Sequence, residues 1–288
     1  MKIPYIDGDW RILFKPEKTG NYINDHTIIK AHDGKYHLFG ITSFEGGAPN
    51  ERYFAHGATK SLDTPMSEEG RAIDRGTLAW APCVVRGDND YYYMYYGPSP
   101  SSLSISIDLY EWMNYKLVLN NETPMGAHRD HFVMKINENE YLMYVVGIKD
   151  KRGCVSLFHS SNLLEWDFCG YALTSGKDAP LNPAWGAMES PFVIKIDEYY
   201  YLFITYTDCS QENYNNTLVF TSFDPKSFGE YNGGNGGAIP ITTLSAHAPE
   251  IKKEGENYYI TTCGWNGYYA VPNKGCVSIA PLKWKDVE

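Results

Sequence analysis

The sequence predicts an all-β protein, a five-bladed β-propeller with antiparallel blades around a central axial pocket. One unit of sequence occurs five times, and each copy runs from an apolar strand through a polar turn into a tyrosine-rich strand. Anchored on Asp25, Pro82, Asp130, Glu189 and His247, the copies are 57, 48, 59 and 58 residues apart, close to the length of propeller blades. No segment longer than about ten residues has a clear helical period.

Each copy opens with a short apolar strand followed by a turn. The five strands read HTIIKA, PCVVRG, HFVMKI, PFVIKI and PEIKKE. The turns AHDGK, GDND, NENE, DE and EGEN supply the Gly, Asp and Asn that tight hairpins need. The strand after each turn is dominated by Tyr, Phe, Leu and Met, and we expect it to pair antiparallel with the first.

A third strand follows in each copy, starting near Tyr53, Leu103, Val155, Thr217 and Gly275. It ends in Leu-x-x-Trp at Trp112 and Trp166 and in the related PLKW at Trp284, and we expect these tryptophans to be wedges between blades. The segment EEGRAID from Glu68 is the best, though weak, helix candidate. The run EYNGGNGGAIP from Glu230 is predicted to be a loop between blades. No boundary is visible, so residues 1–288 are predicted to form one domain.

Composition and charge exclude several partners. The formal net charge is −10 and no Lys/Arg run occurs, which argues against a nucleic-acid partner. The first ten residues have no apolar signal core and no later stretch is long enough to span a bilayer, so no membrane partner is expected. Six cysteines without a CxxC pair indicate buried free thiols. These features predict a cytoplasmic protein, or an exported one whose signal peptide has been removed; they indicate no oligomeric state.

Three carboxylates are the best candidates for chemistry. Asp25, Asp130 and Glu189 each precede the first strand of a copy, and a radial repeat brings such positions together around one axis. Like charges placed together should raise at least one pKa and keep one acid protonated at neutral pH. Hydrolysis of a glycosidic bond requires this combination of a carboxylate and a carboxylic acid.

These residues resemble the motifs of the five-bladed furanosidase superfamily, glycoside hydrolase families 32, 68, 43 and relatives. Asn24-Asp25, Arg129-Asp130 and Glu189-Ser190-Pro191 are similar to the Asn-Asp-Pro, Arg-Asp-Pro and Glu-Cys-Pro motifs of family 32. Trp80-Ala81-Pro82 and His247 are similar to blade-two and blade-five motifs of family 43. The resemblance spans the whole chain in order.

The resemblance implies roles for these residues. Asp25 would be the nucleophile, as in family 32, or the base that activates water, as in family 43. Asp130 would stabilise the transition state, Glu189 would be the general acid, and Arg129 would hold the carboxylates together. Residues expected to bind the substrate are Asn24, Trp80, Arg129, His128, Trp185 and His247, with Trp265 and Tyr22 as further aromatic candidates. No cofactor is required, although His247 could face a water-coordinated structural calcium on the axis.

The histidines leave two alternatives open. His26 and His131 follow the aspartates where the families usually have proline. Strand alternation should point their side chains away from the aspartates, so that they pack between blades. Alternatively, His26, His128, His131 and His247 line the same end and form a metal site with the carboxylates.

The leading hypothesis is a glycoside hydrolase that cleaves a furanoside or related bond in a small oligosaccharide or glycan end. The alternatives are a catalytically silent sugar-binding propeller and a phosphorylase or transglycosylase on the same scaffold. Retaining and inverting mechanisms predict carboxylate separations of about 5–5.5 Å and about 6.5–9.5 Å. Specificity is expected to reside in loops such as residues 44–52 and 210–216.

Overall fold

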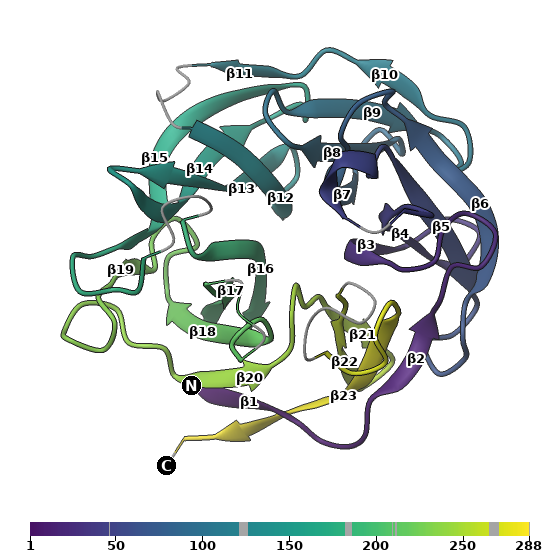
Figure 1. Cartoon of the computed structure of the whole chain (residues 1–288). Coiled ribbons are helices and arrows are strands. Elements are labelled where there is room, and N and C mark those ends of the chain that lie inside the picture. The colour runs from purple at the N-terminus through teal and green to yellow at the C-terminus, as the bar shows by residue number, and fades with distance from the viewer. Residues whose placement is uncertain are drawn as a thin grey trace.

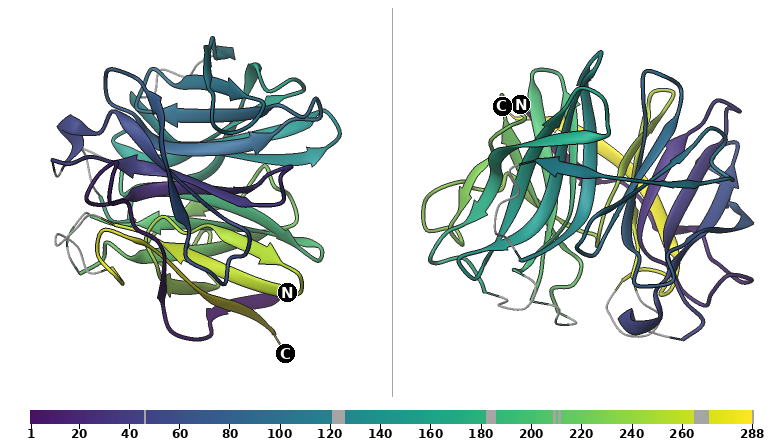
Figure 2. Two further views of the ribbon diagram at one scale, coloured as in Figure 1. Left: turned by 90° about the vertical axis from the view of Figure 1, so that its right-hand side faces the viewer. Right: turned by 90° about the horizontal axis from the view of Figure 1, so that it is seen from above.

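A computed structural model describes residues 1–45, 47–120, 126–181, 186–208, 210, 212–264 and 271–287. These residues form five sheets arranged in a ring, and the strand that opens each sequence copy lies nearest the centre (Figure 1). Turned views show the strands spanning the molecule between two loop-bearing ends (Figure 2). The predicted all-β five-bladed propeller is confirmed.

The blades follow the five sequence copies in order. Blade 1 consists of β3 (Asn24–Lys30), β4 (Tyr36–Thr42), β5 (Tyr53–Thr59) and β6 (Ser67–Asp74). Blade 2 consists of β7 (Trp80–Arg86), β8 (Tyr92–Gly97), β9 (Ser102–Ser106) and β10 (Met113–Tyr115). Blade 3 consists of β12 (Gly126–Asn137), β13 (Glu140–Lys149), β14 (Arg152–Ser160) and β15 (Glu165–Ser175). The short strands β11 (Val118–Asn120) and β19 (Gly229–Tyr231) pair parallel with β15.

The last two blades complete the ring. Blade 4 consists of β16 (Met188–Ile196), β17 (Tyr199–Tyr206), β18 (Asn216–Ser222) and β20 (Thr242–Ser245). Blade 5 combines β21 (Ile251–Glu254), β22 (Asn257–Thr262) and β23 (Val277–Asp286) with β1 (Lys2–Ile6) and β2 (Arg11–Phe14). β1 pairs antiparallel with β23, so the two chain ends lie close together and share a blade (Figure 1). A short 3₁₀ turn, η1 (Ala48–Asn50), is the helical element of the described chain.

Three tryptophans wedge neighbouring blades together, as the sequence predicts. Each follows or lies in an outer strand of its blade, and its ring meets an aromatic ring of the preceding blade edge to face, a favourable geometry. The pairs and centroid distances are Trp112–Phe39 at 5.6 Å, Trp166–Tyr95 at 5.7 Å and Trp284–Tyr201 at 4.9 Å. The hydrophobic core therefore lies between blades and not on the axis.

Two expectations about elements and thiols are wrong. The segment from Glu68 is not helical but forms most of β6, the outermost strand of blade 1, where exposure alternates along the chain. A half-solvated edge strand needs few apolar residues, so its pattern is weak. Cys169 is exposed, whereas Cys83, Cys154, Cys263 and Cys276 are buried free thiols as expected. Cys209 lies outside the described residues.

The run from Glu230 is largely turn, as expected, although its first residues belong to β19. In the described chain there is no helix with the length and apolar character needed to cross a membrane.

Candidate active site

Every blade turns its backbone at the point where its innermost strand begins. One residue there has a left-handed backbone, and these residues are Asp25, Ala81, Asp130, Ser190 and Ala248, with φ of 25°, 47°, 55°, 50° and 46°. In blades 1 to 4 the ladder to the next strand shifts register at this point. Such bulges re-aim side chains and occur next to active sites. Here they direct the starts of the inner strands toward the axis.

The three carboxylates do not occupy equivalent backbone positions. Asp25 and Asp130 are themselves the left-handed residues, whereas Glu189 precedes the left-handed Ser190. Three of the sequence anchors differ by one residue from the left-handed position of their blade: Pro82, Glu189 and His247. The reason is that a backbone angle, and not a residue type, defines the equivalent position. In blade 4 the carboxylic residue therefore comes one position before the left-handed residue.

Two residues hold the carboxylates together. The Arg129 guanidinium donates to Asp130 Oδ2, to Glu189 Oε1 at 3.3 Å and to the Met188 carbonyl oxygen at 3.0 Å. Ser190 donates its main-chain N–H to Asp130 Oδ2 at 3.0 Å and its hydroxyl to Asp25 Oδ1 at 3.1 Å. The structure thus brings Asp25, Asp130, Glu189 and Arg129 into one network from blades 1, 3 and 4.

The site favours a protonated Glu189. Burial raises the pKa of Glu189 to about 8, against the opposing Arg129 charge and with help from the charges of Asp130 and Asp25. Burial also raises the pKa of Asp130, to about 6, although Arg129 counteracts it. Burial raises the pKa of Asp25, while Arg129 and the Ser190 hydroxyl act against that rise. At neutral pH Glu189 is therefore the carboxyl group of the cluster that retains its proton.

Replacing Glu189 by glutamine should stabilise the fold at alkaline pH. In the unfolded chain a glutamate ionises near pH 4.5, whereas the folded protein retains the Glu189 proton up to about pH 8. The unfolded state therefore binds fewer protons in this window, and the free energy of unfolding falls as the pH rises through it. At pH 8, removing the group should therefore raise the free energy of unfolding by a few kcal/mol. This is on the order of one kcal/mol for each pH unit between the pKa of Glu189 in the unfolded chain and its pKa in the folded protein.

Urea denaturation of both proteins at pH 4 and pH 8 measures this effect. The matched control is Glu198→Gln, at the exposed turn beyond the other end of β16. If the free energies of unfolding of the wild type and Glu189→Gln differ by the same amount at pH 4 and pH 8, Glu189 does not carry the unfavourable buried charge.

His247 lies beside Asp25. Its Nε2 is 3.7 Å from Asp25 Oδ1, and its Nδ1–H donates to the Tyr214 carbonyl oxygen at 3.0 Å. The Tyr214 ring stacks on His247 at 3.8 Å, and its hydroxyl donates to Asn24 Oδ1 at 3.4 Å. Burial lowers the pKa of His247 to about 4, so the ring is neutral at pH 7 and, with Nδ1 protonated, presents an unprotonated Nε2 to the carboxylate.

The alternative metal site, built from the histidines and the carboxylates, finds no support in these contacts. Within the described ranges, no group of three or more His, Cys, Asp and Glu side chains is arranged to hold an ion. A water-coordinated calcium that faces His247 stays a prediction.

His26 and His131 pack between blades. His26 Nε2 lies 2.7 Å from Thr261 Oγ1 of blade 5, and His131 Nε2 lies 2.7 Å from Ser101 Oγ of blade 2. His128 packs edge-on against Phe158 of its own blade. These contacts favour the packing alternative for His26 and His131.

The aromatic candidates for substrate binding lie in different surroundings. Trp80 packs against the core between blades 1 and 2, and Tyr22 donates its hydroxyl to the buried Glu51 at 2.8 Å. Trp185 and Trp265 lie outside the described residues. The substrate-binding roles of Trp80, Trp185 and His128 remain predictions.

One family model matches most of the chain. The model described as glycosyl hydrolases family 32 N-terminal domain matches residues 14–234. The chain belongs to this family. No curated protein sequence matches it significantly.

Solved structures share the fold of this family 32 chain. The family 32 β-fructofuranosidase of Bombyx mori superposes with a TM-score of 0.68 at 17% identity, over 96% of this chain and 62% of that one. A thermostable family 43 glycoside hydrolase gives 0.65 at 20% identity, over 95% and 96%. A family 43 β-xylosidase/α-arabinofuranosidase from a compost metagenome gives 0.65 at 15% identity, over 98% and 96%. The chain thus spans less than two thirds of the Bombyx mori enzyme.

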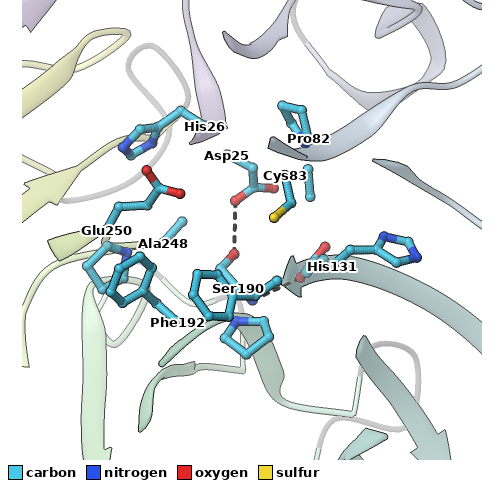
Figure 3. Close-up of a pocket in the computed structure, with 14 residues that line it drawn as sticks. Asp25, His26, Pro82, Cys83, His131, Ser190, Phe192, Ala248 and Glu250 are labelled. Carbon is cyan, nitrogen blue, oxygen red and sulfur yellow. Dashed lines mark hydrogen bonds between the residues drawn. The ribbon is translucent and has the colours of Figure 1, made fainter. Parts of the chain in front are cut away.

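A narrow channel continues along the axis beneath the carboxylates of this family 32 chain. Its walls come from all five blades and enclose a cavity of about 30 Å³, room for one or two waters (Figure 3). On its wall, Glu250 accepts the Ile28 N–H at 2.6 Å and pairs with Lys252 at 3.0 Å. This volume is too small for a sugar ring, which favours access to Asp25 from the end at which the inner strands begin.

Three residues that the sequence analysis gave no role make contacts at this site or along the channel. Ser190 joins both aspartates, Tyr214 fixes His247, and Glu250 ties blade 5 to blade 1. Ser190 could have been found from its place directly after the general-acid candidate. Tyr214 had no local signal, because it lies in a loop between β17 and β18 and meets His247 only in the closed ring.

Proposed function

We propose that the protein is a glycoside hydrolase that cleaves a furanoside, with Asp25 as nucleophile, Asp130 as stabiliser of the transition state and Glu189 as general acid. One observation carries the proposal. A single hydrogen-bonded network joins Asp25 to Asp130 through Ser190, and Asp130 to Glu189 through Arg129. This set combines the ionised and protonated carboxyl groups that glycoside hydrolysis needs.

The reaction would proceed in two steps. Asp25 attacks the anomeric carbon while Glu189 gives its proton to the departing glycosidic oxygen, so an alcohol leaves and a glycosyl ester of Asp25 forms. The Glu189 carboxylate then removes a proton from water, which attacks the same carbon and releases Asp25. The Asp130 carboxylate, held by Arg129, would stabilise the positive charge that develops on the ring. Two displacements at one carbon preserve the anomeric configuration.

Three arginines near this end are already engaged. Arg129 binds the carboxylates, Arg75 donates to the carbonyl oxygens of residues 78, 97, 98 and 100, and Arg71 lies over the Tyr53 ring at 4.0 Å. A phosphate co-substrate would need such a cation. These contacts favour water as the acceptor over phosphate.

A substrate panel tests the proposed function. Because the Bombyx mori family 32 relative is a β-fructofuranosidase, sucrose and short β-fructofuranosides come first, followed by aryl arabinofuranosides and aryl pyranosides. We expect turnover of a furanoside, with release of the sugar in its original anomeric configuration, observed by proton NMR in the first minutes. Inversion would instead make Asp25 a base. Binding of sugars without any turnover would identify a silent binding propeller.

A further inference from the structure

Ser190 connects the two aspartates of the site. Its hydroxyl donates to Asp25 Oδ1 at 3.1 Å, and its main-chain N–H donates to Asp130 Oδ2 at 3.0 Å. Figure 3 shows the Ser190 side chain and the Asp25 carboxylate facing each other across the axis, from β16 and β3. One residue of blade 4 therefore binds a carboxylate of blade 1 and a carboxylate of blade 3.

The backbone of blade 4 is shaped to present both donors. Ser190 has a φ of 50°, and the ladder between β16 and β17 passes from Glu189 paired with Thr205 to Phe192 paired with Phe203. Ser190 and Pro191 are thereby released from strand pairing. The Ser190 N–H is free to point at Asp130 and not at β17, which is a typical consequence of a bulge.

Both contacts that the described residues make with the Asp25 carboxylate involve the same oxygen. Oδ1 accepts the Ser190 hydroxyl and is also the oxygen nearest His247 Nε2, at 3.7 Å. His247 already donates through Nδ1 to the Tyr214 carbonyl oxygen, so the neutral ring has no second proton to give to Asp25. The hydroxyl of Ser190 is thus the neutral donor that orients this carboxylate.

We propose that Ser190 is a positioning residue of the reaction: its hydroxyl fixes Asp25 through Oδ1 and leaves Oδ2 to attack the anomeric carbon. Its N–H holds Asp130 in the same frame, so the nucleophile and the stabilising carboxylate keep a constant separation. This inference rests on the proposed function, because it assigns Asp25 the attacking role.

The proposal predicts a pH effect whose sign follows from the surroundings of Asp25. Several titratable and charged groups surround it. They are Arg129 and Asp130 on β12, Glu189 on β16, His247 before β21 and Cys263 after β22, and, along the channel, His26 on β3, Cys83 on β7 and Glu250 directly before β21. Of these, Arg129 favours the Asp25 anion, as the Ser190 hydroxyl does. Deleting the hydroxyl removes a donor to the anion, so the pKa of Asp25 must rise.

Ser190→Ala and Ser190→Gly test the proposal as a pair. Both remove the hydroxyl, but glycine relaxes the left-handed backbone whereas alanine retains its strain. We expect kcat/KM to fall by about ten- to a hundredfold in both, and its acidic limb to move up by about one pH unit. The alkaline limb and KM should change little. Ser190→Cys, which keeps a weaker donor, should lie between the wild type and these variants.

A direct titration separates this proposal from the proposed function. The carboxyl carbon of Asp25 can be followed by carbon-13 NMR and assigned by its absence in Asp25→Asn. If the pH midpoint of the Asp25 titration is higher in both Ser190 variants than in the wild type, the proposal is supported. An unchanged midpoint overturns it, whatever happens to activity, and so does a large loss in alanine that glycine fully restores. If the wild type turns over no furanoside, the proposed function fails, and the attacking role assigned to Asp25 fails with it.

Discussion

Asp25→Asn should lower kcat on a furanoside by at least about 10⁴-fold, which is the scale on which enzymes lose turnover when a nucleophile is removed. Asparagine has the same shape, and its carbonyl oxygen can still accept the Ser190 hydroxyl that binds Asp25 Oδ1 at 3.1 Å. The amide, however, cannot form the glycosyl ester. The fold should be retained or become more stable, because partial burial raises the pKa of Asp25 and its charge is therefore unfavourable.

The matched control is Asp197→Asn. Asp197 lies at the turn beyond the far end of β16 and also has a left-handed backbone, with a φ of 54°, so the substitution and the conformation are the same. Its ion pair with Lys2 is exposed and contributes little stability. Steady-state rates and thermal unfolding of both variants are the measurements. Hydrolysis by Asp25→Asn at more than a few per cent of the wild-type rate, with the control unchanged, would remove Asp25 from the nucleophile role.

The sequence predicted the blades because each repeats a local signal. A short apolar strand, a hairpin turn and a tyrosine-rich strand identify themselves within about 20 residues, so all five inner pairs could be found. The edge strand β6 could not. Its alternation of exposed and half-buried residues contains few apolar side chains, and over a short segment that pattern resembles a polar helix.

The candidate site was predicted to the level of its charged residues. Asp25, Asp130, Glu189 and Arg129 stand out because they interrupt an otherwise uniform repeat. The contacts that organise them do not stand out, because they depend on backbone angles and ring closure. Ser190 reaches Asp25 across 165 positions of sequence, and only its left-handed φ allows hydroxyl and N–H to serve two blades. The offset of Glu189 from the aspartates has the same origin.

Glu189→Gln should separate substrates by their leaving groups. For sucrose or an alkyl furanoside the departing oxygen needs a proton, and kcat/KM should fall by about 10²- to 10⁴-fold. An aryl furanoside with several nitro groups leaves as a stable anion, so its first step should slow by less than about tenfold. A general loss of structure would lower kcat/KM equally for both kinds of substrate. Glu198→Gln is again the matched control, and its rates should be those of the wild type.

The pH dependence of kcat/KM is a second test of Glu189→Gln. The alkaline limb of wild-type kcat/KM should fall off near pH 8, where Glu189 loses its proton, and glutamine should abolish that limb for the activated substrate. The second step then lacks its base, so the glycosyl ester of Asp25 should accumulate and the first turnover should appear as a burst. Azide attacks without needing a base; it should restore turnover and yield a glycosyl azide of unchanged anomeric configuration. If azide does not accelerate turnover and the alkaline limb persists in the variant, the acid and base of this site must be sought in another residue.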